Sequence, residues 1–315
     1  MLALSPNVGL PGGPRRHRLL VSAIEHPSVL AGGRFPANLV EQFPVTYDGI
    51  IDLSALARRM AALAADGASP LVSVMIANNE TGVIQPVAEA AAIVHEAGGL
   101  LHVDAVQGAG RIHIDINDLC ADLLTISAHK IGGPKGVGAL IRRQRDLDIE
   151  PLVTGGGQES RLRAGTENVA GIAGFGAACT CINQSINGEI AVLAERRNLL
   201  EQVLRVSHAS LVVFGDNNPR LPNTTLFAIP GVKAETAIIA LDLAGVAVSS
   251  GAACSSGKVA PSHVLAAMGI APDLARGAIR VSLGPTTTES DIDFFQNAWI
   301  KVLGPLVKGQ RTIAA

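Results

Sequence analysis

Short apolar runs alternate with amphipathic stretches along the first half of the chain. The runs predict β-strands at residues 19–24, 71–76, 100–103, 123–126 and 138–141. Apolar positions at helical spacing predict helices over residues 53–65 and 87–97. Pro86 precedes the second of these helices, and Gly98 and Gly99 follow it, which is the order expected for a helix start and stop. This alternation predicts an α/β domain with a mainly parallel sheet and helices on both faces.

The pattern changes near residue 186. We expect a charged helix over residues 189–206, strands at 211–214, 224–228 and 279–282, helices at 234–243 and 262–268, and a last helix from Glu289. The sequence therefore predicts a large domain over residues 1–185 and a smaller C-terminal α+β domain over residues 186–315. A chain of 315 residues is long enough to build both cores.

Polar groups of complementary chemistry follow four of the predicted strands. His26 follows the first strand, Asn79 follows the second, and Asp104 and Gln107 follow the third. The fourth strand leads into the sequence SAHK, which ends at Lys130, and then into a glycine-rich turn. Since ligands bind at the carboxyl ends of strands in an open parallel sheet, we expect these groups to converge.

Lys130 is the candidate nucleophile of this group. A lysine that is partly desolvated at a strand end loses its proton more easily, so its amine can form a Schiff base. Such an amine suits pyridoxal phosphate, whose pyridine nitrogen needs a carboxylate such as Asp104. The flat imidazole of His26 can stack on the ring, and Asn79 and Gln107 can bond its phenolic oxygen.

Two other interpretations fit some of these residues. Lys130 can be an ordinary solvated lysine in a loop. His102 and Asp104 share one face of a strand, so with His26 and His129 they can form a metal site. The metal hypothesis does not account for Lys130, and we expect no metal.

Composition narrows the possible partners and the setting. The net charge of −2 gives no reason to expect binding to nucleic acid or to an anionic membrane. The four cysteines are unevenly spaced, which favours a reducing, cytoplasmic setting over a disulfide framework. No uncharged apolar run is expected to approach membrane-spanning length, so the sequence predicts a soluble protein.

Seven motifs along the chain are similar to those of a known family. They are SAIEHPSV, ANNETGVIQP, HVDAVQ, SAHKIGGPKGVGAL, RLRAGTENV, SSGAACSSG and IRVSLG, at residues 22–29, 77–86, 102–107, 127–140, 161–169, 249–257 and 279–284. In this order they resemble the cysteine desulfurases of the class V aminotransferase group, among the fold-type I pyridoxal-phosphate enzymes. The resemblance covers essentially the whole chain, and it implies release of alanine from L-cysteine with transfer of the sulfur to an enzyme cysteine.

The resemblance implies a role for each cofactor residue. Lys130 would bind pyridoxal phosphate covalently and shuttle the α-proton, while His26 would stack on the ring and donate a proton to the product. Asp104 would pair with the pyridine nitrogen, and Asn79 and Gln107 would bond the phenolic oxygen. The phosphate would be held by Ser127 and His129, and by Thr166 from the second subunit of a homodimer.

Two residues would handle the substrate. Arg280 would bind the carboxylate of L-cysteine, a bidentate task that suits a guanidinium, although an arginine in an apolar strand can equally have a structural partner. Cys254 would accept the sulfur, since it lies in a run of small residues that does not anchor it in a core. We expect Cys120, Cys179 and Cys181 to be packing residues, as most cysteines are.

The chain departs from the family at its front. Family members carry a leading segment that ends in a Gly-x-Thr-Glu loop, whose backbone donors and helix end hold the cofactor phosphate. That loop is absent here, so the resemblance is to an N-terminally truncated member with weakened phosphate binding. Two alternatives stay open: a related lyase or aminotransferase such as a selenocysteine lyase, and an inactive remnant that binds a full-length subunit or a sulfur-acceptor protein. In the desulfurase interpretation, sulfur-acceptor or scaffold proteins for iron–sulfur cluster or thio-cofactor assembly are the expected partners.

Overall fold

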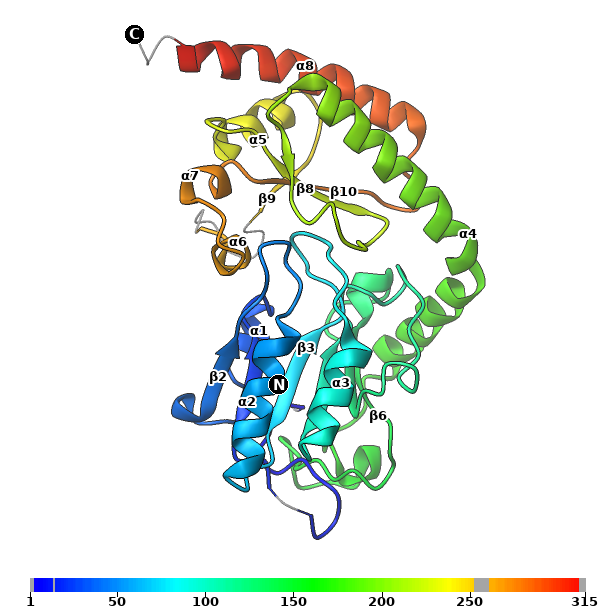
Figure 1. The fold of residues 1–315 in the computed structure, drawn as a ribbon. Coiled ribbons are helices and arrows are strands. Elements are labelled where there is room, and N and C mark those ends of the chain that lie inside the picture. Colours follow the sequence, from blue (N-terminus) through cyan, green and yellow to red (C-terminus); the bar gives the residue numbers. More distant parts are fainter. Residues whose placement is uncertain (1–2, 14, 252–260, 312–315) are drawn as a thin grey trace. The chain divides into compact units, whose positions relative to one another are not determined.

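The computed structural model describes residues 3–13, 15–251 and 261–311. The described chain divides into two compact units (Figure 1). The first comprises residues 1–46, 50–78 and 85–186, and the second comprises 47–49, 79–84 and 187–315. Two short segments from the first half of the sequence, including Asn79 and Glu80, therefore belong to the second unit.

The first unit contains a six-stranded sheet in the order β2-β1-β3-β4-β5-β6. All neighbouring strands are parallel except β5 and β6. The strands are β1 (Leu19–Ser22), β2 (Val40–Phe43), β3 (Leu71–Met75), β4 (Leu100–Asp104), β5 (Leu123–Ser127) and β6 (Gly138–Arg142). The mainly parallel sheet predicted from the sequence is confirmed.

Helices of the first unit cover the sheet (Figure 1), and α1 and α2 start at side-chain caps. They are α1 (Pro27–Leu30), α2 (Leu53–Ala65) and α3 (Val87–Glu96), with the 3₁₀ helices η1 (Ala37–Leu39), η2 (Ala128–Ile131) and η3 (Gln158–Arg161). Asp52 caps α2 by accepting a hydrogen bond from the amide of Ala55 at 2.8 Å. Strands β1 and β3 are buried along their whole length, as expected when both faces of a parallel sheet are covered.

One long helix, α4 (Val169–Ser207), passes from the first unit into the second. The sequence predicted only its charged half, because glycines and small residues weaken the helical pattern before Glu189. By length and composition this helix is apolar enough to cross a membrane. Only 17% of its apolar 18-residue stretch is buried within the protein. Our expectation that no run approaches that length was wrong, since no charged side chain occurs between Val169 and Glu189. A single helix of this kind is weak evidence for a membrane span.

The second unit contains a four-stranded antiparallel sheet in the order β7-β8-β10-β9. Its strands are β7 (Val212–Val213), β8 (Thr224–Ala228), β9 (Ser249–Ser250) and β10 (Ile279–Ser282), and its helices are α5 (Ala234–Leu243), α6 (His263–Ala267), α7 (Pro272–Ala275) and α8 (Glu289–Arg311). The core forms around the fully buried Trp299, whose ring meets Phe227 edge-on at 5.4 Å between centroids. The indole N–H of Trp299 donates to Ser207 Oγ at 2.9 Å, which ties α8 to the end of α4.

Candidate functional site

Four neighbouring strands of the first sheet, β1, β3, β4 and β5, end in polar residues at the same edge of the sheet. This follows from their parallel pairing, because parallel strands place their carboxyl ends together. His26 follows β1, Asn78 follows β3, Asp104 ends β4, and Ser127 ends β5. The topology therefore brings together the strand ends that the sequence singled out.

Asp104 is a buried carboxyl group at this edge, with 7% of its surface exposed. Burial raises the pKa of its carboxyl, while a hydrogen bond from the amide of Val106 and the attraction of His26 and Lys130 oppose that rise. Both side chains lie close enough to Asp104 to interact with it electrostatically. Asp104, His26 and Lys130 thus form one coupled group.

His26 is half-buried and held by its own turn. It is the N-cap of α1, and its Nδ1 accepts a hydrogen bond from the amide of Ser28 at 3.2 Å and lies 2.8 Å from Ser28 Oγ. Its neighbour Glu25 is fully buried and accepts a hydrogen bond from the amide of Met75 at 2.6 Å. Burial and repulsion from Asp104 raise the pKa of Glu25 well above its usual range, while the hydrogen bond from the amide of Met75 opposes that rise. The sequence analysis did not single out Glu25, although an acidic residue at a buried strand end was a visible signal.

Lys130 lies in η2, directly after β5. Ala128 of the same turn is buried, and Lys130 itself is exposed. The expectation that Lys130 is desolvated is therefore not met within the described chain. Arg111, which the sequence analysis did not single out, donates to the carbonyls of Lys130 at 3.2 Å and Gln107 at 2.9 Å. This arginine links the turn after β4 to the lysine-bearing turn.

Two of the three predicted phosphate ligands, Ser127 and His129, lie next to each other. Ser127 Oγ lies 2.8 Å from His129 Nδ1, so these two side chains form a pair, and His129 is exposed. Thr166 is exposed on a loop of the first unit. The preceding residues Glu159, Ser160 and Arg161 have φ angles of 46°, 57° and 68°, a left-handed run that is strained for non-glycine residues.

A second group of predicted residues lies in the second unit. Arg280 on β10 donates through Nη1 to the carbonyl of Asn79 at 2.8 Å and through Nη2 to Ser249 Oγ at 3.4 Å. Asn79 Oδ1 is buried and has no hydrogen-bond partner within the described ranges. Cys254, the predicted sulfur acceptor, lies outside the described residues.

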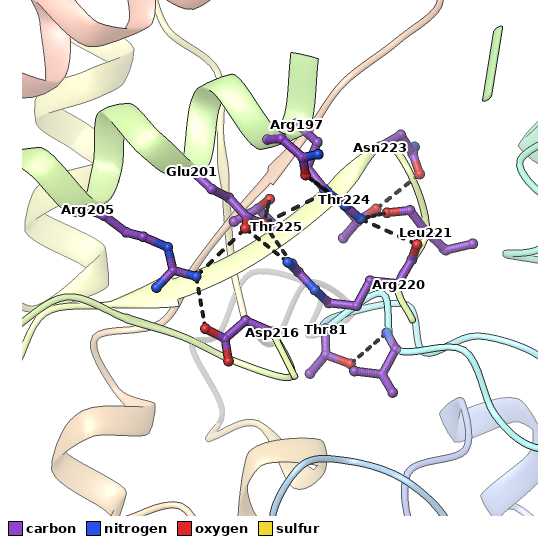
Figure 2. A network of polar contacts seen from close by, with 12 residues as sticks. Thr81, Arg197, Glu201, Arg205, Asp216, Arg220, Leu221, Asn223, Thr224 and Thr225 are labelled. Carbon is purple, nitrogen blue, oxygen red and sulfur yellow. Dashed lines mark hydrogen bonds and ion pairs between the residues drawn. The ribbon is translucent and has the colours of Figure 1, made fainter. Parts of the chain in front are cut away.

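The segment that carries Asn79 is bonded to the loop before β8. Leu221 donates its amide to Gly82 at 2.8 Å, and Ile84 donates its amide to Pro219 at 2.9 Å. Arg197 of α4 in turn donates to the carbonyl of Leu221 at 2.8 Å (Figure 2). Gly82 has a φ of 76° and packs against Thr224, so a side chain there would be strained.

Asp104, His26 and Lys130 fit pyridoxal phosphate and do not fit a metal site. A buried carboxylate is coupled to a lysine and an imidazole, which are the groups that the cofactor needs at its nitrogen, aldehyde and ring face. His102 is not available as a metal ligand, since its ring nitrogens lie 2.8 Å from Ser73 Oγ and 3.2 Å from Thr125 Oγ1. Burial lowers its pKa to about 3. Among the described residues no three His, Cys, Asp or Glu side chains gather as metal ligands.

The other cysteines differ from expectation. Cys179 and Cys181 on α4 are exposed, and Cys120 is half-buried. The prediction that they are packing residues was wrong for Cys179 and Cys181, because the apolar half of α4 is mostly unburied within this chain.

Comparison with known proteins agrees with the fold and these motifs. The family model for class-V aminotransferases matches residues 10–295. The cysteine desulfurase of Klebsiella pneumoniae is 41% identical over 308 residues, which cover 96% of this chain and 74% of that protein. The cysteine desulfurase IscS of Dictyoglomus turgidum is 40% identical over 299 residues, which cover 94% of this chain and 73% of that protein.

Solved structures show the same architecture. A NifS-like protein from Rickettsia africae superposes with a TM-score of 0.81 at 36% identity, covering 91% of this chain and 76% of that one. The apo cysteine desulfurase of Thermococcus onnurineus superposes with a TM-score of 0.77 at 26% identity, covering 98% and 76%. The chain therefore belongs to the class-V aminotransferase family. The members of that family to which it is similar at about 40% identity are cysteine desulfurases.

Proposed function

We propose that the protein is a pyridoxal-phosphate-dependent L-cysteine desulfurase, which converts L-cysteine to alanine and leaves the sulfur on Cys254 as a persulfide. The observation that carries the proposal is the coupled group of Lys130, Asp104 and His26 at the carboxyl edge of the parallel sheet. Membership in the class-V aminotransferases and similarity to cysteine desulfurases support it.

Each residue has a defined task in this proposal. When bound, pyridoxal phosphate supplies an electron sink for chemistry next to the amino group of the substrate. Lys130 holds the cofactor and carries a proton to and from the substrate, and Asp104 keeps the pyridine nitrogen protonated. His26 covers the ring face, and Ser127 and His129 donate to the phosphate. Asn79 and Gln107 bond the phenolic oxygen.

Arg280 and Cys254 act on the substrate itself. The guanidinium of Arg280 binds the substrate carboxylate. The thiolate of Cys254 attacks the substrate sulfur, so that an S–S bond forms while the C–S bond breaks. The β-carbon takes a proton, for which His26 is the donor, and alanine is the product. We propose that the persulfide then passes to an acceptor or scaffold protein for iron–sulfur cluster or thio-cofactor assembly.

We propose that the protein works as a homodimer. Thr166 is exposed, and it lies three residues before α4, whose first residues Val169 and Ile172 are 71% and 46% exposed. Exposed apolar side chains next to a predicted cofactor ligand are expected where a second subunit contributes that ligand. Sedimentation of the wild-type protein and of Ile172→Asp tests this, since the proposal expects a dimer that the variant weakens.

The activity is tested with purified protein, pyridoxal phosphate and L-cysteine. We expect alanine and, with a thiol reductant, sulfide in equal amounts. Cys254→Ser should abolish both products while the visible absorption of the loaded protein stays. Cys181→Ser is the matched control and should retain activity. If the wild-type protein forms no alanine, or if Cys254→Ser still releases sulfide, the proposed function or the assigned acceptor is wrong.

A further inference from the structure

A buried carboxylate, Glu80, lies in the second unit and has no task in the function proposed above. Only 3% of its surface is exposed. Its Oε2 accepts a hydrogen bond from Ser262 Oγ, and it is attracted electrostatically to Arg280. Ser262 is distant in sequence, so this contact exists only in the folded chain.

Stability alone gives a weak reason for this carboxylate. Burial raises the pKa of Glu80 to about 7, while the Ser262 hydrogen bond and the charge of Arg280 pull it downward. A buried carboxyl costs free energy unless its partners compensate, and apolar replacements of buried ion pairs are often neutral or stabilising. The buried carboxyl of Glu80 is therefore better explained by the side chains that it orients.

Ser262 and Arg280, which interact with Glu80, belong to different parts of the second unit. Ser262 is the N-cap of α6, where its Oγ accepts a hydrogen bond from the amide of Leu265 at 3.0 Å. Arg280 on β10 donates to the carbonyl of Asn79, the residue that precedes Glu80, at 2.8 Å. Arg280 also reaches Ser249 on β9 at 3.4 Å. Glu80 and its neighbour thus join β9, β10 and the start of α6 in one polar cluster.

We propose that Glu80 is a positioning residue, whose carboxylate fixes the guanidinium of Arg280 and the first turn of α6 in one arrangement and so sets the direction in which Arg280 meets the substrate carboxylate. The inference rests on the proposed function, because it takes Arg280 as the group that binds that carboxylate. A bidentate carboxylate contact is sensitive to orientation, since two parallel N–H groups must face two oxygens.

Two substitutions separate the charge of Glu80 from its hydrogen bond to Ser262. Glu80→Gln keeps an oxygen that can accept from Ser262 and removes the charge that attracts Arg280. Glu80→Ala removes both. Glu195→Gln, at an exposed position of α4, is the matched control. The measurements are KM and kcat for L-cysteine, and amide hydrogen exchange of peptides spanning residues 262–270 and 277–283.

We expect Glu80→Ala to raise KM about tenfold, the scale of losing one hydrogen bond to a charged group, with kcat changed less than about twofold. Exchange should accelerate at the start of α6 and around Arg280. Glu80→Gln should raise KM by several fold and leave exchange in α6 as in the wild type, and the control should change nothing. A purely structural role would lower the amount of active enzyme, and hence kcat, without a selective rise in KM.

The proposal is overturned if KM stays at the wild-type value in Glu80→Gln, or if kcat falls while KM does not change. If Glu80→Ala does not fold, Glu80→Gln alone decides between these outcomes. If the wild-type protein does not turn over L-cysteine, the proposed function fails by itself, and hydrogen exchange then decides on Glu80. In that case unchanged exchange in Glu80→Ala overturns the positioning role, and faster exchange in both peptides supports it.

Discussion

Arg220 and Glu201 form a bidentate ion pair, with 2.7 Å between Nη1 and Oε1 and 2.9 Å between Nη2 and Oε2. Their side chains are 5% and 9% exposed, so water screens this pair little. Glu201 also accepts a hydrogen bond from Thr225 at 2.8 Å (Figure 2). The pair thereby fixes the loop around Arg220 to α4 and β8. Since this loop is bonded to the segment of Asn79 and Glu80, a structural ion pair supports residues of the candidate site.

Glu201→Gln should destabilise the protein strongly. The substitution leaves the guanidinium of Arg220 buried without an opposite charge, which costs about 3–5 kcal/mol when one partner of a buried pair is removed. Urea unfolding of the purified chain measures this loss. Glu195→Gln on the exposed side of the same helix should have no measurable effect. An unchanged urea midpoint in Glu201→Gln would show that the pair contributes nothing to folding.

Asp122 should make the stability of the protein depend on acid pH. Burial raises the pKa of its carboxyl, but hydrogen bonds from His95, the amide of Leu101 and Arg143 outweigh burial, and the net pKa is lowered. Because the folded pKa lies below the unfolded one, the stabilisation is complete above the unfolded pKa, near pH 4, and is lost as the pH falls through the folded pKa.

The measurement compares urea midpoints of the wild type and Asp122→Asn between pH 7 and pH 2.5. The wild type should be the more stable at pH 7, and the difference should shrink below about pH 4, the ordinary range of an aspartate pKa. Asp118→Asn, at an exposed position nearby, should follow the wild type at every pH. A difference that stays constant down to pH 2.5 would mean that the ionisation of Asp122 is not its cause.

Lys130→Ala should remove the covalent attachment of pyridoxal phosphate. We expect the protein with added cofactor to lose the visible absorption band, and borohydride to leave no label on the chain. Turnover of L-cysteine should fall by at least on the order of a hundredfold, since the proton-transfer group is lost as well. Lys135→Ala, in the same exposed turn, is the control and should keep band and label. A borohydride label on Lys135 in the wild type would contradict the assignment.

Arg280→Lys should weaken substrate binding selectively. The lysine ammonium keeps the positive charge but lacks the planar, two-sided set of N–H donors of a guanidinium. It therefore cannot donate to the Asn79 carbonyl and to a substrate carboxylate in the same geometry. We expect KM for L-cysteine to rise about tenfold, as for one lost charge-assisted hydrogen bond, while the visible absorption of the loaded protein stays. If the variant instead unfolds at lower urea with an unchanged KM, the arginine has a structural role.

Local sequence patterns predicted much of the fold and of the site. The predicted helix at residues 53–65 and the strands at 224–228 and 279–282 match α2, β8 and β10 in full. The helix has apolar positions at helical spacing and the Asp52 cap, and both strands are short apolar-rich runs, so these signals act over a few residues. Strand β2, with the sequence VEQF, was missed because it is short and carries two polar residues. The full length of α4 was missed because its first half has no polar face that marks a helix.

The sequence by itself determined which chemical groups stand at the strand ends, because each follows its strand directly in the chain. Strand order was decided only by the tertiary structure, and it places β1, β3, β4 and β5 side by side. Exposure of Lys130 and of the cysteines of α4 also depends on what packs over them, which no local pattern encodes. The contacts of Glu80 with Ser262 and of Arg220 with Glu201 join residues that are far apart in the chain. Such contacts form only when burial removes water and makes a buried charge require a partner.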